Sequence, residues 1–153
     1  MMSIDNAKYN YYQGYHDIGL FFLMLYFNSP NMGINTFQRV SEFYIKDYLY
    51  KNTNMANKFD FESTLNLLMD VIKEIDHKIY VKLQEICEIP YFALPWIITW
   101  FTHNTDSISL QYRIFDYLIC SHPIAAFVLS ASVNKYVKCD KDYIKENCVF
   151  TKT

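Results

Sequence analysis

A short segment near the start of the chain, residues 11–17 with the sequence YYQGYHD, concentrates side chains that could act on a bound partner. The amide of Gln13 can donate one hydrogen bond and accept another, so it can orient a water molecule without being a strong base. Gly14 beside it lets another backbone approach closely. Taken alone, Gln13 would be interpreted as a surface glutamine at the start of a helix. Only the surrounding motif can favour a catalytic role for it.

The cysteines and histidines of the second half make a weaker case for chemistry. The chain has four cysteines, Cys87, Cys120, Cys139 and Cys148. None is at C-x-x-C spacing, no signal peptide precedes them, and the Cys120-Ser121-His122 step lacks the ligand spacing of a zinc site. A nucleophilic cysteine needs a lowered thiol pKa and a partnered histidine, which the sequence does not indicate. We expect reduced cysteines, no metal site and no resident cofactor.

Composition limits the remaining classes of function. The chain has 153 residues, is 52% hydrophobic and carries a formal charge of -2, which fits one globular domain. Gly 3 and Pro 4 are too few for the turns of a β-sandwich or barrel, so a helical protein is favoured. The lysines and arginines are scattered along the chain and form no basic patch that would bind nucleic acid. The longest weakly polar run, residues 119–133, is shorter than the ~20 apolar residues that a membrane span needs.

Hydrophobic spacing predicts the first helices. Residues 15–27 are apolar almost all round, which is typical of a helix buried in the middle of a bundle. Residues 28–35 are predicted to form a turn, and an amphipathic helix with Phe37, Val40, Ile45 and Leu49 follows, ended by the polar stretch 51–58.

The middle of the chain has the clearest helical pattern. Asp60 can cap a helix in which four residues share one face: Leu65, Leu68, Met69 and Ile72. Asp76 can cap the next helix, with Ile79, Leu83 and Ile86 on one face, which should stop before Pro90.

The second half is predicted to hold three further helices. Residues 92–101 and 107–119 are helical stretches separated by the polar residues 103–106, and Pro123 stands at the first position of a last helix that runs to about Val137. The predicted fold is all-α with about seven helices. We expect the core to include Leu23, Leu68, Ile72, Trp96, Phe101 and Phe115.

Two separated motifs resemble one family. The segment 11–18, YYQGYHDI, resembles the Y-x-Q-G motif of the TBC domain, a Rab GTPase-activating domain in which a glutamine supplied in trans enters the GTPase site. The later segment 92–101, FALPWIITWF, followed by RIFDY at 113–117, resembles that family's Trp-containing helix and its Arg-x-x-Asp helix. The resemblance covers roughly residues 9–137, so we expect a partial TBC domain over 1–138 and a polar C-terminal tail over 139–153.

The particular residues in these motifs are most similar to one subfamily of the TBC family. GYHD at 14–17, where most members have an asparagine, together with the FAL-x-W-x-ITWF segment and the Ser121-His122-Pro123 step, is most similar to the ER-associated TBC subfamily. Members of that subfamily act on the Rab of ER-to-Golgi traffic. The resemblance therefore implies vesicle trafficking, and a cytoplasmic protein peripheral to ER and Golgi membranes.

The resemblance also implies roles for single residues. Gln13 would be the catalytic residue supplied to a Rab, which itself binds the GTP and magnesium, so the chain would be a GTPase activator rather than an enzyme on its own. The residues expected to contact the Rab are Tyr11, Tyr12, Gly14, Tyr15 and His16. Those expected to be structural are Asp17, Trp96, Arg113 and Asp116, the last two as a local i, i+3 ion pair. Any one of the tyrosines could instead be a core aromatic.

One part of the family pattern is missing. The family's arginine finger belongs to an I-x-x-D-x-x-R motif well upstream of Y-x-Q-G, and only ten residues precede that motif here. Neither Arg39 nor Arg113 occupies such a position. The chain thus resembles the C-terminal two-thirds of the domain, incomplete at its N-terminal side, and we expect exposed apolar surface. The alternatives are a non-catalytic Rab-binding module or a truncated gene product.

Overall fold

The structure is a computed structural model that describes residues 11–49 and 61–136. Its elements are α1 (Tyr15–Leu25), α2 (Pro30–Val40), the π-helical turn η1 (Ser41–Ile45), α3 (Lys46–Leu49), α4 (Phe61–Ile75), α5 (His77–Ile86), the 3-10 turn η3 (Tyr91–Ala93), α6 (Leu94–Ile98), the 3-10 turn η4 (Thr102–Asn104), α7 (Ile108–Ile119) and α8 (Ala125–Tyr136). The described residues contain no strand, which confirms the all-α prediction. The expected break at 51–58, the Asp60 cap and the tail at 139–153 lie outside the described residues.

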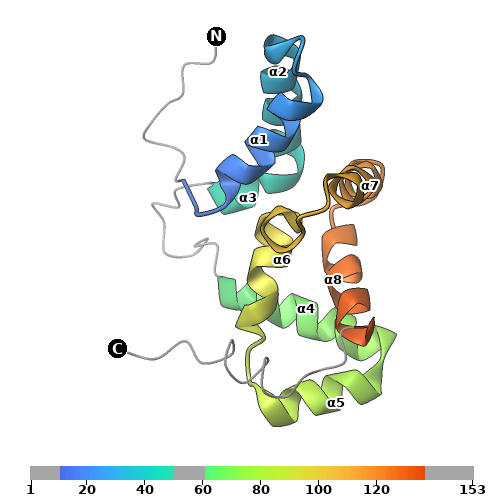
Figure 1. The fold of residues 1–153 in the computed structure, drawn as a ribbon. Helices are drawn as coiled ribbons and strands as arrows, with labels where there is room; N and C mark the ends of the chain where they lie inside the picture. The colour runs from blue at the N-terminus through green and yellow to red at the C-terminus, as the bar shows by residue number, and fades with distance from the viewer. Residues whose placement is uncertain (1–10, 50–60, 137–153) are drawn as a thin grey trace, which may run out of the picture.

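The helices surround two hydrophobic clusters, and α6 lies between them (Figure 1). The upper cluster, drawn at the top of Figure 1, joins α1, η1 and α7 through residues that include Ile18, Phe22, Ile45 and Phe115. The lower cluster joins α4, α5, α6 and α8 through residues that include Leu68, Leu83, Trp96 and Phe127. The segment that follows α6 contributes to both clusters, because Trp100 belongs to the upper one and Phe101 to the lower.

The lower cluster follows the sequence pattern closely. All four residues of the predicted face of α4 are buried: Leu65, Leu68, Met69 and Ile72. Asp76 caps α5 as predicted, because its carboxylate accepts hydrogen bonds from the backbone N–H groups of Lys78 at 3.1 Å and Ile79 at 3.3 Å. Both helices are therefore positioned by the periodicity and the cap that the sequence shows.

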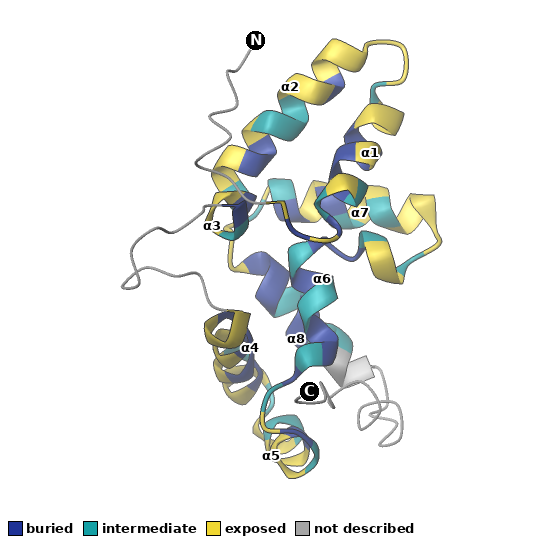
Figure 2. Cartoon of the chain, turned by 90° about the vertical axis from the view of Figure 1, so that its left-hand side faces the viewer, coloured by how far each residue is buried: buried dark blue, intermediate teal, exposed yellow. Residues whose placement is uncertain are grey.

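The prediction of an all-round buried helix at 15–27 is wrong. Ile18, Phe21 and Phe22 of α1 are buried, whereas Leu23 is 41% exposed and Phe27 is 81% exposed, so Leu23 does not belong to the core. The reason is the position of the neighbours, since α2 and α7 pack against one side of α1 and no described residue covers the other (Figure 2). Exposed apolar residues lie on this face of α1, and others lie on α2, η1 and α7. The other predicted core residues are buried: Leu68, Ile72, Trp96, Phe101 and Phe115.

The predicted turn at 28–35 is shorter than expected, because α2 begins at Pro30. Proline suits the first helical turn, where its missing N–H removes no intrahelical bond. A Cβ at Gly33 would lie 2.9 Å from the backbone oxygen of Phe22, so the glycine allows α2 to approach the end of α1. Pro123 is also displaced from its predicted place, since α8 begins only at Ala125.

Candidate functional site

Gln13 stands on a tight turn directly before α1, in a segment that we name the Gln13 loop (residues 11–14). Gln13 is exposed and Gly14 is buried. Gly14 has φ +96°, a left-handed conformation that favours glycine, and it forms the N-cap position of α1. Its carbonyl accepts a hydrogen bond from the N–H of Asp17 at 3.1 Å. The loop therefore presents the glutamine to solvent while its glycine is packed inside.

The loop lies on a second unusual backbone segment, which we name the left-handed turn (residues 99–101). The predicted helix over 92–101 ends instead at Ile98, and Trp100 and Phe101 have φ of 51° and 63°. Such a conformation in two aromatic residues costs about 1–3 kcal/mol each. Burial opposes this cost, because Trp100 and Phe101 are only 4% and 6% exposed. The N–H of Phe101 also donates to the carbonyl oxygen of Trp96 at 3.1 Å.

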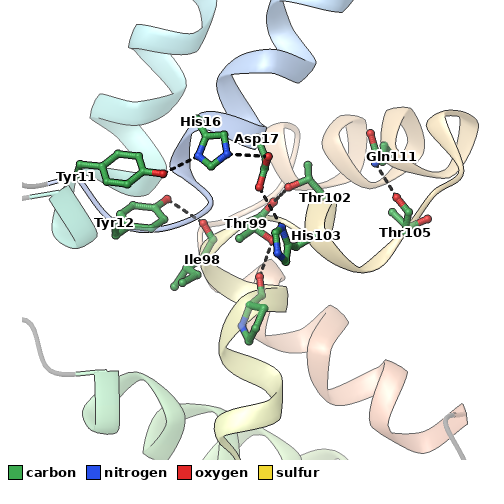
Figure 3. A network of polar contacts seen from close by, with 11 residues as sticks. Tyr11, Tyr12, His16, Asp17, Ile98, Thr99, Thr102, His103, Thr105 and Gln111 are labelled. Atoms are coloured by element: carbon green, nitrogen blue, oxygen red, sulfur yellow. Dashed lines mark hydrogen bonds and ion pairs between the residues drawn. The ribbon is translucent and has the colours of Figure 1, made fainter. Parts of the chain in front are cut away.

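Three contacts join the Gln13 loop and the start of α1 to residues 98–103 (Figure 3). The hydroxyl of Tyr12 donates to the carbonyl oxygen of Ile98 at 2.8 Å. A Cβ built on Gly14 would lie 2.4 Å from Cγ2 of Thr99, so no other side chain fits there. Nδ1 of His103 lies 3.1 Å from Oδ2 of Asp17. The exposed glutamine thus stands between contacts that fix the backbone on both sides of it.

The tyrosines of the motif face different ways. Tyr12 is buried, and its burial raises the pKa of its hydroxyl far above the usual range, with smaller contributions from neighbouring tyrosines. Burial also raises the pKa of Tyr15, whose hydroxyl donates to Oγ of Ser41 at 2.9 Å. Tyr11 is 64% exposed. Tyr12 and Tyr15 therefore shape the loop from within, and the surface open to a partner is made of Tyr11, Gln13 and His16.

Asp17 joins two imidazoles. Its Oδ1 lies 3.3 Å from Nε2 of His16, and its Oδ2 faces His103. On the far side of His16, Nδ1 lies 2.6 Å from the hydroxyl of Tyr11. Asp17 was expected to be structural by bonding backbone near the loop, but its carboxylate instead contacts two imidazoles and links the first turn of α1 to η4.

The residues of the second motif lie apart from Gln13. Trp96 is buried in the lower cluster and stacks on Phe101, with 5.9 Å between the ring centroids. Arg113 and Asp116 are both exposed on α7, and no ion pair joins them in the described part of the chain, contrary to the expected pairing. Phe115 between them stacks on Phe21 of α1 at 3.8 Å. The aromatic residue thus connects α7 to the site, and the charged ones do not.

Sequence reasoning missed the residues that support the loop from outside the motif. Thr99 lies inside the segment that resembles the family, but its contact with Gly14 depends on the left-handed turn, which no spacing predicts. His103 was interpreted only as part of a polar break between helices. It follows the same segment by two residues, and that proximity was the one available signal.

The described residues hold no evident site for other groups. Among residues 11–49 and 61–136, no three His, Cys, Asp or Glu side chains gather as ligands for a metal ion. Cys87 is buried and Cys120 is exposed, while Cys139 and Cys148 lie outside the described residues. Within the same ranges, no helix has the length and apolar character needed to span a membrane.

Comparison with known proteins agrees with the motifs. The family model described as RabGAP-TBC, the Rab-GTPase-TBC domain, matches residues 1–142. The chain is 28% identical to TBC1 domain family member 20 of Homo sapiens over 142 residues, which cover 90% of this chain and 34% of that protein. It is 36% identical to the GTPase-activating protein gyp10 of Schizosaccharomyces pombe over 126 residues, which cover 80% of this chain and 31% of that protein. The chain thus spans about a third of the length of these relatives.

Proposed function

Because this chain belongs to the RabGAP-TBC family, we propose that it stimulates GTP hydrolysis by a Rab GTPase through Gln13, supplied in trans. The observation that carries the proposal is the contrast at the loop, where Gln13 is exposed while Tyr12 and Gly14 on either side of it are buried. Tyr12 is hydrogen-bonded to Ile98, and Gly14 packs against Thr99. A side chain presented in this way can enter the nucleotide site of a partner without reorganising its own backbone.

The chemistry of GTP hydrolysis suits a glutamine in this position. The reaction needs a water molecule held in line with the γ-phosphate and positive charge facing the oxygens that gain negative charge. The amide of Gln13 can accept a hydrogen bond from the water and donate another to the phosphate. Because the loop is fixed beforehand, less entropy is lost when the reacting groups are brought together.

The positive charge requires an arginine from elsewhere. Arg39 on α2 and Arg113 on α7 are both exposed, and neither makes a hydrogen bond or an ion pair with the Gln13 loop among the described residues. An arginine finger contributes about 10³- to 10⁵-fold in rate. We therefore propose that the arginine comes from outside these 153 residues, and that this chain alone stimulates hydrolysis only weakly.

The partner follows from the same motif. We propose that the exposed residues Tyr11 and His16 contact the Rab beside Gln13, while Tyr12, Gly14 and Tyr15 act by giving the loop its shape. The GYHD variant favours the Rab of ER-to-Golgi traffic, with its GTP and magnesium, as the substrate complex. The proposed place of action is the cytoplasmic surface of ER and Golgi membranes.

A second function fits one observation. Since neither arginine of the chain contacts the loop in the described residues, the chain could bind a GTP-loaded Rab without accelerating hydrolysis. It would then be an interaction module that retains the loop as a binding surface.

Single-turnover GTP hydrolysis separates the two functions. A panel of GTP-loaded Rabs is mixed with the 153-residue chain and, separately, with the protein in its full length, and Rab binding is measured in parallel. Binding by both with strong acceleration by the full-length protein supports the activator. Binding without acceleration by either supports the module, and no binding to any Rab contradicts both.

A further inference from the structure

Asp17 links two parts of the chain that lie 86 residues apart in sequence. It belongs to the first turn of α1, whereas His103 belongs to η4, just after the left-handed turn. The carboxylate of Asp17 is 25% exposed, and the side chains of His16 and His103 are 64% and 56% exposed. The contact between His103 and Asp17 is therefore open to water, and it joins the first turn of α1 to η4 (Figure 3).

The hydrogen-bond partners indicate which ring nitrogens carry a proton. A carboxylate only accepts hydrogen bonds, so Nδ1 of His103 and Nε2 of His16 are the donors to Asp17. With Nε2 of His16 as the donor to Asp17, its Nδ1 accepts from the hydroxyl of Tyr11 at 2.6 Å.

Asp17 transmits this contact to the loop. Its backbone N–H donates to the carbonyl oxygen of Gly14 at 3.1 Å, and its Oδ2 lies 3.8 Å from the position of a Cβ on Gly14. On the other side of Gln13, Tyr12 is held separately by its hydrogen bond to the carbonyl oxygen of Ile98. His103 is thus linked through Asp17 to Gly14, the residue that follows the glutamine.

We propose that His103 is a positioning residue for the GTPase-activating reaction, which acts through Asp17 by holding the Gln13 loop in the orientation that places the glutamine amide on the attacking water. The proposal rests on the proposed function of Gln13. A small displacement of a reacting group lowers the rate of the chemical step more than it lowers binding. Loss of His103 should therefore reduce the maximal rate of hydrolysis and leave Rab affinity nearly unchanged.

The test uses the full-length protein and single-turnover GTP hydrolysis at saturating concentration, with affinity for the Rab measured separately. His103→Ala should lower the maximal rate by about tenfold, while the affinity changes by less than about twofold. His103→Asn should restore most of the rate, because its amide N–H can take the place of Nδ1. His103→Gln, whose amide is one carbon further out, should not. His77→Ala, an exposed histidine on α5 at the other end of the molecule, is the matched control (Figure 1).

Gln13→Ala, alone and combined with His103→Ala, completes the design. If the proposal is right, the double variant is no slower than Gln13→Ala, because the histidine acts only through the glutamine. A full rate for His103→Ala, or equal rates for His103→Asn and His103→Gln, overturns the role of His103 while a slow Gln13→Ala leaves the proposed function standing. A full rate for Gln13→Ala overturns the proposed function itself.

Discussion

The helices α1 and α4 are both rich in apolar residues, but they use them differently. In α4 the apolar face is buried, and the opposite side carries exposed polar residues such as Asn66, Asp70 and Lys73. In α1 the buried face of Ile18, Phe21 and Phe22 is matched by an exposed face that is also apolar. The contrast is one of degree, because α4 exposes Leu67 and Ile75 beside its polar residues, whereas the exposed face of α1 is mostly apolar.

The two helices also differ in their position relative to the Gln13 loop, so substitutions in them should affect different properties. The residues of α4 are distant from the Gln13 loop, and they lie in the lower cluster (Figure 1). The N-terminal end of α1 carries the loop itself. Substitutions in α4 should therefore change the free energy of unfolding, and substitutions at the start of α1 should change the rate of stimulated GTP hydrolysis.

The largest effect on stability is expected at Leu68, which is 0% exposed. Leu68→Ala should cost about 2–5 kcal/mol in the free energy of unfolding, because it removes buried methyl groups and leaves a cavity. Urea denaturation measures it, with Leu67→Ala on the exposed side of α4 as the control. Equal costs for the two variants would show that this face of α4 is not the core.

Gly14→Ala should reduce both stability and rate. The added Cβ would meet Thr99 at a left-handed φ, so the loop must move, at a cost of about 1–3 kcal/mol. We expect at least about a tenfold loss of the maximal stimulated rate. Gly19→Ala is the control, since its Cβ would meet only the ring of Phe37, at 3.1 Å. A Gly14→Ala variant with full rate would show that the backbone at Gly14 does not govern the glutamine.

Alkaline pH should reduce the stability that the buried tyrosines Tyr12 and Tyr48 contribute. Burial raises the pKa of Tyr12 and of Tyr48 above the ordinary value near 10, so the unfolded chain loses these protons first. Stability from both groups is therefore complete below about pH 10 and declines as the pH rises above it. Urea denaturation at pH 8 and pH 10.5 should show a smaller alkaline loss for Tyr12→Phe than for the wild type. An unchanged loss in that variant would assign the alkaline effect elsewhere.

The smallest effect is expected on the exposed face of α1. Leu23→Gln should change the free energy of unfolding of the 153-residue chain by less than about 0.5 kcal/mol, because Leu23 is 41% exposed and lies among other exposed apolar residues of α1. A cost comparable to that of Leu68→Ala would mean that this face is covered, and the contrast between α1 and α4 would fail.

Local patterns predicted much of this molecule. Periodicity placed the face of α4, a short carboxylate placed the cap of α5, and the motif placed Gln13 before a helix. The left-handed turn could not be predicted in this way, since Trp100 and Phe101 adopt it against their own preference and only tertiary burial compensates. The contact between Asp17 and His103 depends on that turn, so it was equally inaccessible.

The most direct test of the account is the maximal single-turnover rate of GTP hydrolysis by the Rab in the presence of the full-length protein carrying Gln13→Ala. We predict a fall of about a hundredfold or more, with Rab affinity and melting temperature unchanged, because the amide acts on the transition state and is exposed in the free protein. An unchanged maximal rate would contradict the claim that the loop exists to present Gln13.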